Sequence, residues 1–218
     1  MRIGEPMQRI VVASITAALT LVLAGCASTS AVPVAGAGST RPATATRLPN
    51  VRSLLLSISD LPTGWTVDNS SNAAGSLSCV PGSLAHGAEA DADASFERGG
   101  GLPVLEESIG FFASAPPVFA VAVKALNACK TFTTTGGGRS HRGTLGAMSF
   151  PSYGDQSAAY DANLTVQGLN VNEGLVLVRK GGYIALVVLG DVGSLGSLDI
   201  SMLEGFVTQA VAKISAAG

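Results

Sequence analysis

The sequence predicts an α+β domain in which a mostly antiparallel sheet has helices packed on one face. Segments with strand character follow one another in runs, which is typical of hairpins and not of alternating βαβ units. Two long segments have helical spacing instead, one in the middle of the chain and one at its end. Of the 218 residues, 47% are hydrophobic and 13% are charged. This composition excludes a disordered polyelectrolyte, a coiled coil and a collagen-like chain.

The helical segments are recognised by the spacing of their apolar residues. In Pro117–Cys129 the apolar residues recur on one face, and proline occupies the first turn, where its missing N–H is tolerated. In Asp199–Ser215 six apolar residues form a stripe, and Ser201–Glu204 resembles a capping box. Val51–Ser59 is a shorter helical segment that should end before Pro62.

The predicted strands are separated by turns that are rich in glycine. Gly99–Gly101 and Lys180–Gly182 should be tight hairpin turns, because glycine adopts the positive φ angles that such turns need. Glu106 and Glu107 are neighbours in one strand, so they should point to opposite faces of the sheet. Strands are expected at Thr63–Val67, Ala92–Arg98, Leu105–Ala113, Lys130–Thr135, Gly143–Phe150, Ala158–Gln167, Gly174–Arg179 and Tyr183–Leu189.

The N-terminus has the pattern of a secretion signal. Two arginines precede Ile10–Leu23, an apolar run of 14 residues that is too short for an ordinary membrane-spanning helix. The run ends in Leu23-Ala24-Gly25-Cys26, which resembles the lipobox of bacterial lipoproteins, where the cysteine is acylated and the chain is cut before it. A plain secretory signal with an incidental cysteine is the alternative. Translation can start at Met1 or at Met7.

These features divide the chain into three parts. Residues 1–25 are expected to be a lipoprotein signal peptide. Residues 26–50 begin with acylated Cys26 and continue as a flexible tether of mostly Ala, Ser, Thr and Pro. Residues 51–218 are expected to form a single domain. The expected location is the extracytoplasmic face of the cell membrane, with the lipid anchor at Cys26 as the membrane contact.

Cys79 and Cys129 remain once Cys26 is assigned to lipid. They lie 50 positions apart in a chain that is predicted to be exported, which favours a disulfide bond. A metal site is the alternative interpretation, but no CxxC motif or nearby histidine supports it. We therefore expect no metal ion at these cysteines.

The sequence contains no motif for a known catalytic or cofactor site. It lacks GxSxG, SxxK, HExxH, a P-loop and the dinucleotide-binding GxGxxG, so neither enzyme activity nor a cofactor is expected. The two histidines, His86 and His141, lie in polar, glycine-rich stretches and form no metal-type pair. A net charge of −2 gives no electrostatic basis for binding nucleic acid.

An acidic cluster is one candidate for ion binding. Glu89, Asp91, Asp93 and Glu97 are spaced like oxygen ligands of calcium, but the glycine and terminal glutamate of an EF-hand are absent. A solvated acidic loop is the simpler interpretation, and no metal is predicted.

Gly136–Arg142 is a basic, glycine-rich stretch. Backbone amides and arginines both favour anions, so Arg139, His141 and Arg142 are weak candidates for binding a phosphate or an anionic sugar. The alternative is a hairpin loop without a binding role. Trp65, the only tryptophan, is either a core residue or a weak candidate for stacking on a ligand.

Several short stretches together resemble a known group of proteins. They are Ser59–Trp65, Ala128-Cys129, Gly154–Ser157 and Val176–Tyr183. They are similar to actinobacterial, especially mycobacterial, envelope lipoproteins and to the extracellular sensor-like domains of membrane serine/threonine kinases. The resemblance spans most of residues 51–218, and it implies a non-enzymatic α+β domain with a groove for ligands.

Three functional classes follow. The first is a lipid-anchored, non-catalytic module that binds a small envelope molecule or a partner protein. The second is a carrier of lipid or glycolipid, which requires a large apolar cavity between the sheet and the helices. The third and least favoured is a serine hydrolase, because the sequence offers no catalytic triad.

Overall fold

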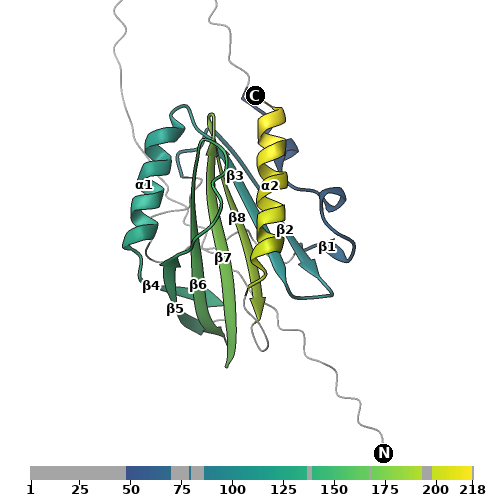
Figure 1. The fold of residues 1–218 in the computed structure, drawn as a ribbon, viewed down its shortest axis with the longest axis vertical. Coiled ribbons are helices and arrows are strands. Elements are labelled where there is room, and N and C mark those ends of the chain that lie inside the picture. Colours follow the sequence, from purple (N-terminus) through teal and green to yellow (C-terminus); the bar gives the residue numbers. More distant parts are fainter. Residues whose placement is uncertain are drawn as a thin grey trace, which may run out of the picture.

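The computed structural model describes residues 48–69, 79, 86–136, 139–166, 168–192 and 198–217. Within these ranges the chain forms an eight-stranded sheet in which every pair of neighbouring strands is antiparallel. The predicted α+β class and the antiparallel sheet are therefore confirmed (Figure 1). The elements are η1 (Val51–Leu54), η2 (Ile58–Asp60), β1 (Trp65–Val67), β2 (Ala90–Arg98), β3 (Val104–Phe111), α1 (Ala115–Ala128), β4 (Thr131–Gly136), β5 (Arg139–Ala147), β6 (Gln156–Val166), β7 (Leu169–Lys180), β8 (Tyr183–Val192) and α2 (Ile200–Ala216).

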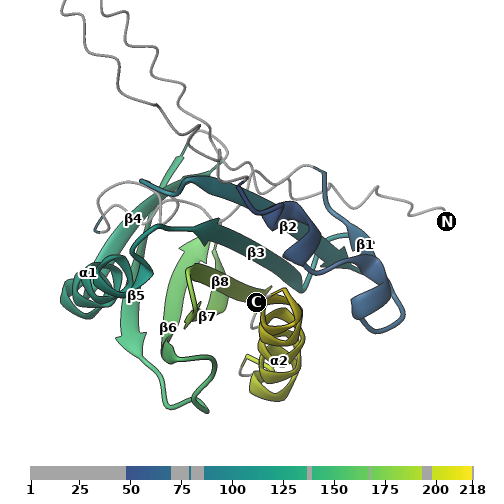
Figure 2. The same ribbon diagram turned by 90° about the horizontal axis from the view of Figure 1, so that it is seen from above.

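The strand order explains why a helix connects β3 to β4. The order across the sheet is β1-β2-β3-β8-β7-β6-β5-β4, so β4 to β8 form consecutive hairpins and β8 returns beside β3. Helix α1 follows β3 and leads to β4 at the far edge, and it packs against β5, β7 and β8 on the way. Seen from above, the sheet is strongly curved (Figure 2).

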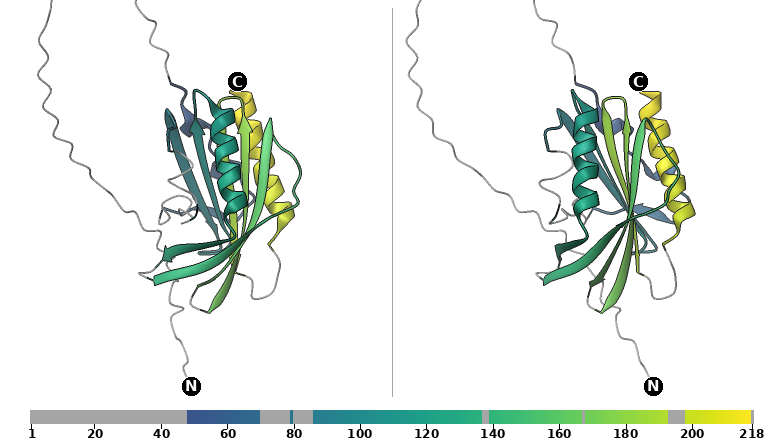
Figure 3. Two further views of the ribbon diagram at one scale, coloured as in Figure 1. Left: turned by 90° about the vertical axis from the view of Figure 1, so that its left-hand side faces the viewer. Right: turned by 60° about the vertical axis from the view of Figure 1, so that its left-hand side comes forward.

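The prediction that both helices pack on one face is wrong, because α1 and α2 cover opposite faces. Leu175 and Leu177 of β7 pack in one cluster with α1, whereas Val176 and Val178 pack in another with α2. Successive side chains of a strand point to opposite faces, so this alternation places the sheet between the helices. The right-hand view of Figure 3 shows the central strands between them. The strands at the centre are apolar on both sides, and each side needs its own cover.

The start of α2 also differs from the prediction. The helix begins at Ile200, and its N-cap is Asp199, whose side chain accepts a hydrogen bond of 3.0 Å from the Met202 N–H. The predicted capping box at Ser201–Glu204 is wrong because Ser201 already lies inside the first turn. An acidic N-cap satisfies one of the free N–H groups at the helix start.

Val51–Ser59 does not form one helix. It forms the two short 3-10 turns η1 and η2, with extended backbone at Leu55 between them. Leu54, Leu55 and Leu56 are all buried, and three consecutive residues cannot lie on one face of an α-helix. Breaking the helix lets all three leucines reach the core.

Two of the stretches that carry the family resemblance form one structural unit. Asp155, just before β6, belongs to the stretch Gly154–Ser157, and it contacts the β7–β8 hairpin turn of the stretch Val176–Tyr183. Its carboxylate accepts hydrogen bonds from the Gly181 N–H at 2.9 Å and from Arg179 at 2.9 Å. These hydrogen bonds lower the pKa of Asp155 below its ordinary value, with the Gly181 N–H contributing most. Asp155 is also within 3.3 Å of Lys180. The two stretches therefore have a structural role: one binds and fixes the hairpin turn of the other.

The predicted disulfide is present. Cys79 and Cys129 are bonded, with 5.6 Å between their Cα atoms, and Cys129 is the C-cap of α1. Residues 1–47 lie outside the described residues, so the signal peptide and acylated Cys26 stay predictions. Within the described ranges, no helix has both the length and the apolar composition that crossing a membrane requires.

Candidate functional site

The strands β4 to β7 have one apolar and one polar face. Phe132, Leu145 and Leu164 point towards α1 and are buried. The residues between them point to the face that α2 covers only in part, and they are mostly threonine and asparagine. They include Thr131, Thr133, Arg142, Thr144, Asp161, Asn163, Thr165, Asn170 and Asn172.

Strand register turns these residues into a row across the sheet. Thr131 pairs with Thr144, Thr144 with Asn163, and Asn163 with Asn172. Asn172 in turn pairs with Asp191 of β8. Cross-strand partners on one face lie about 5 Å apart, so hydroxyl and amide groups repeat along a line across four strands, and the Asp191 carboxylate continues that line on β8.

Two adjoining pockets lie over this row. The first has a volume of about 240 Å³ and the second of about 550 Å³, and both include Asn163 and Asn172 in their lining. We call the two pockets together the polar groove. The first pocket is lined by Met148, Asp161, Ala162, Asn163, Asn172, Glu173, Leu198 and Ile200. The second is lined by Arg142, Gly143, Thr144, Asn163, Leu164, Thr165, Asn170, Val171 and Asn172.

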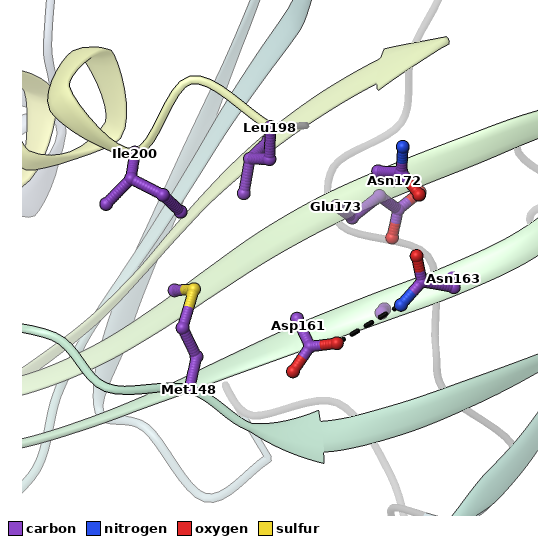
Figure 4. Close-up of a pocket in the computed structure, with 8 residues that line it drawn as sticks. Met148, Asp161, Asn163, Asn172, Glu173, Leu198 and Ile200 are labelled. Atoms are coloured by element: carbon purple, nitrogen blue, oxygen red, sulfur yellow. Dashed lines mark hydrogen bonds between the residues drawn. The ribbon is translucent and has the colours of Figure 1, made fainter. Parts of the chain in front are cut away.

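The start of α2 forms one wall of the polar groove. Leu198 and Ile200 lie across the first pocket from Asp161 (Figure 4). Gly174 of β7 allows this approach, because a Cβ atom there would collide with Leu198 and Leu203. Asp199 then fixes where the helix begins. A glycine and an N-cap thus place an apolar wall beside a polar floor.

Part of the polar floor is hydrogen bonded within the protein. Asn163 donates a hydrogen bond of 3.1 Å to Asp161 (Figure 4), and Thr165 donates one of 3.4 Å to Asn170. Within the described ranges, the side chains of Arg142, Thr144 and Asn172 make no hydrogen bond. These three side chains are available to a ligand, because each is at least partly exposed.

The charges of the polar groove are separated. Arg142 is exposed and lines the second pocket, whereas Asp161 and Glu173 line the first. Burial raises the pKa of Glu173 to about 7, so this carboxyl is protonated in mild acid. The second pocket therefore offers a cation, and the first offers carboxyl and amide groups beside an apolar wall.

The weak ligand-binding candidates from the sequence are not brought together. Gly137 and Gly138 lie outside the described residues, and β5 begins at Arg139, whose side chain is also not described. Because Gly136–Arg142 belongs to a strand hairpin, His141 and Arg142 point to opposite faces of the sheet. Of the candidates whose side chains are described, Arg142 is the one that lies in the polar groove.

Trp65 is a core residue. It is 5% exposed and packs edge-on against Phe206 of α2, with 5.3 Å between ring centroids. A ring covered in this way offers no free face to a ligand, so we do not place Trp65 in the binding site.

The acidic stretch forms a strand and not a loop. Asp91, Asp93 and Glu97 alternate along β2 and point to the same face. In the described part of the chain, no three His, Cys, Asp or Glu side chains are grouped as a metal site would require. His86 is exposed and precedes β2.

Thr144, Asn163 and Asn172 were not among the site residues predicted from the sequence. A signal was present in the alternation of polar and apolar residues along Thr131–Thr135, Thr144–Gly146 and Asn163–Thr165. It shows that one face of each strand is polar, but it does not show which strands are neighbours. Register supplies that information.

Comparison with known proteins identifies a shared fold and no family. No family model matches the chain, and no curated protein matches it. The fold is similar to the crystal structure of the extracellular domain of PknH from Mycobacterium tuberculosis, with a TM-score of 0.56 and 12% sequence identity. The similarity covers 76% of this chain and 94% of that chain. The chain therefore has the α+β fold of that extracellular domain.

Proposed function

We propose that this chain is a lipid-anchored, extracytoplasmic and non-catalytic binding module. Its polar groove takes a ligand that is rich in hydroxyl or amide groups and carries a carboxylate or phosphate. The observation that carries the proposal is the row of threonine and asparagine side chains across the sheet, next to exposed Arg142. The shared fold with an extracellular domain supports an extracytoplasmic location.

The chemistry of the groove favours a sugar-like ligand. Asparagine supplies both a donor and an acceptor, and threonine supplies a hydroxyl that can do either, so the row matches adjacent hydroxyl groups. Arg142 can bind a carboxylate or phosphate through two parallel hydrogen bonds. Leu198 and Ile200 supply an apolar edge for the carbon face of the ligand. Nucleic acid is not a proposed partner, since the net charge of the chain is −2.

The lining of the groove supports binding without catalysis. Among the described residues that line it, there is no histidine, serine or cysteine side chain. Nucleophilic catalysis needs a nucleophile within hydrogen-bond reach of a base, and threonine beside asparagine does not provide that pair.

The carrier of lipid or glycolipid is the alternative function. It requires an apolar cavity between the sheet and a helix. In the described structure, leucine, valine and phenylalanine side chains fill both of these spaces. Native mass spectrometry of the protein with lipids from its host envelope tests the alternative directly. A defined lipid adduct would favour the carrier and count against the polar groove as the main site.

Removing Arg142 should weaken binding strongly. We expect Arg142→Ala to raise the Kd for an acidic sugar about 10- to 100-fold, because a charge-assisted pair is lost. Isothermal titration should compare a disaccharide carrying glucuronic acid, the same disaccharide with a phosphate, and the neutral disaccharide. The preferred acidic form identifies the anion that the groove accepts.

The matched control is Arg52→Ala, which removes an exposed arginine in η1, outside the groove lining. Asn163→Ala should weaken all three sugars by about fivefold, since it removes hydrogen bonds and no charge. Equal affinities for wild type, Arg142→Ala and Asn163→Ala would overturn the groove as the site.

The lipid anchor has its own test. We expect Cys26→Ser to abolish incorporation of radiolabelled palmitate and to move the protein from the membrane fraction to the soluble fraction of an actinobacterial host, because two or more acyl chains are needed for stable anchoring. Thr46→Ala, in the predicted tether, is the control and should keep the label. Palmitate on Cys26→Ser would refute the anchor assignment.

A further inference from the structure

Glu107 is a carboxyl group buried in the middle of the sheet. It lies on β3 and is 0% exposed. Its Oε2 accepts a hydrogen bond of 2.6 Å from the Leu56 N–H, in the segment between η1 and η2. Its Oε1 has no hydrogen-bond partner among the described residues. An ionised Glu107 would have one hydrogen-bond donor for its two oxygens, so the protein would compensate poorly for the hydration that the carboxylate loses on burial.

The surroundings of Glu107 contain one ion pair. The residues opposite it on the neighbouring strands are Ala94 and Val187, which carry no charge. Lys213 of α2 and Asp60 of η2 are the charged groups that act on it, and they bind each other at 2.6 Å. The pKa of Glu107 is raised to about 7, mainly by burial and to a smaller extent by Asp60, while the Leu56 N–H and Lys213 oppose the shift.

The segment that Glu107 holds is the part of the domain nearest to the predicted tether. We call residues 51–60 the N-terminal strap. Val51, Leu54 and Leu55 of the strap pack with Ile109 and Ile214. Among the described residues, the polar links from the strap to the rest of the fold are the Leu56–Glu107 hydrogen bond and the Asp60–Lys213 ion pair.

We propose that Glu107 is a proton-controlled latch that holds the N-terminal strap on the sheet. While the carboxyl is neutral, Oε2 accepts the Leu56 N–H and no charge is buried. When the proton leaves for bulk water, the carboxylate is buried with a single donor. Lifting the strap then lets water reach the carboxylate, so deprotonation favours the open state.

The direction of the pH effect follows from the raised pKa. The docked state binds the Glu107 proton more tightly than the open state, where the pKa returns towards 4.5. Docking is therefore strongest in mild acid, and it weakens as the pH rises through about 7. Because the strap directly follows residues 26–50, lifting it would lengthen the link between the domain and the predicted anchor as the pH rises.

Hydrogen exchange of the full chain at pH 5.5 and pH 8.5 tests the latch. Wild type and Glu107→Gln are compared at the same pH, so that intrinsic exchange rates cancel. We expect strap amides of wild type to lose about tenfold more protection than those of Glu107→Gln when the pH is raised. Glu89→Gln, an exposed carboxyl before β2, is the matched control and should behave as wild type. Equal pH dependence in wild type and Glu107→Gln would overturn the latch.

A second pair of variants keeps the proposal testable if Glu107→Gln does not fold. Asp60→Asn and Lys213→Met break the same ion pair, but they remove charges of opposite sign. Asp60→Asn should move the midpoint of strap opening to lower pH and Lys213→Met should move it to higher pH, each by about half a pH unit. Midpoints that do not move in opposite directions would overturn the latch, because they would show that the charge on Glu107 does not control strap opening.

Discussion

Replacing Phe206 by alanine should lower the free energy of unfolding by about 3–5 kcal/mol. The side chain is 3% exposed and packs in the centre of the cluster that joins α2 to the sheet, with the Trp65 ring at 5.3 Å. Truncation removes the apolar contacts of the ring and leaves a cavity that the two rigid elements on either side cannot close. Urea unfolding followed by Trp65 fluorescence and by far-UV circular dichroism measures the loss.

Gln209→Ala is the matched control for this prediction. Gln209 is exposed on the same helix, so its replacement should change stability by no more than about 0.5 kcal/mol. The packing of α2 on the sheet would be contradicted if Phe206→Ala lost less than about 1 kcal/mol with an unchanged m-value.

The central strands show what the sequence analysis could and could not predict. Their positions were predictable because Val176–Val178 and Ile184–Leu189 are apolar runs bounded by a glycine turn. The same runs are continuous and not alternating, which is typical of a strand buried on both faces. A continuous run requires cover on both faces, which the prediction of helices on one face does not take into account. The opposite placement of α1 and α2 therefore had a local signal.

The polar groove had no comparable signal. Thr144, Asn163 and Asn172 lie on three different strands, and each is unremarkable as an exposed or half-buried polar residue of its own strand. Their proximity depends on the register of β5, β6 and β7, which is fixed by the burial of Leu145 and Leu164 on the other face. In the basic stretch, likewise, the strand β5 points His141 and Arg142 to opposite faces, where a loop would allow them to converge.

The position of Glu107 could be predicted only in part. Adjacent carboxylates on a strand must point to opposite faces, and Glu107 is buried while Glu106 on the other face is partly exposed. Strand alternation alone cannot tell which of the two is buried. That choice depends on the strap, whose Leu56 N–H reaches only one of them.

Removing the disulfide should be as costly as removing Phe206. The double variant Cys79→Ala, Cys129→Ala opens a loop with a sequence separation of 50, which in the chain-entropy model lowers the free energy of unfolding by about 4 kcal/mol. Because the cross-link acts mainly on the unfolded chain, the native circular dichroism spectrum should change little. Urea unfolding of wild type and the double variant, each with and without a reducing agent, measures the difference.

The reducing agent makes this prediction specific to the bond. Reduction should destabilise wild type to about the level of the double variant, and it should leave the double variant unchanged. Cys129 is buried in the α1 cluster, so alanine there also removes one sulfur atom from the core, and the double variant should be slightly less stable than reduced wild type. If reduced wild type kept its full stability, the bond would be dispensable, and the apolar packing of α1, including that of Phe119 and Leu126, would be enough to hold it over the sheet.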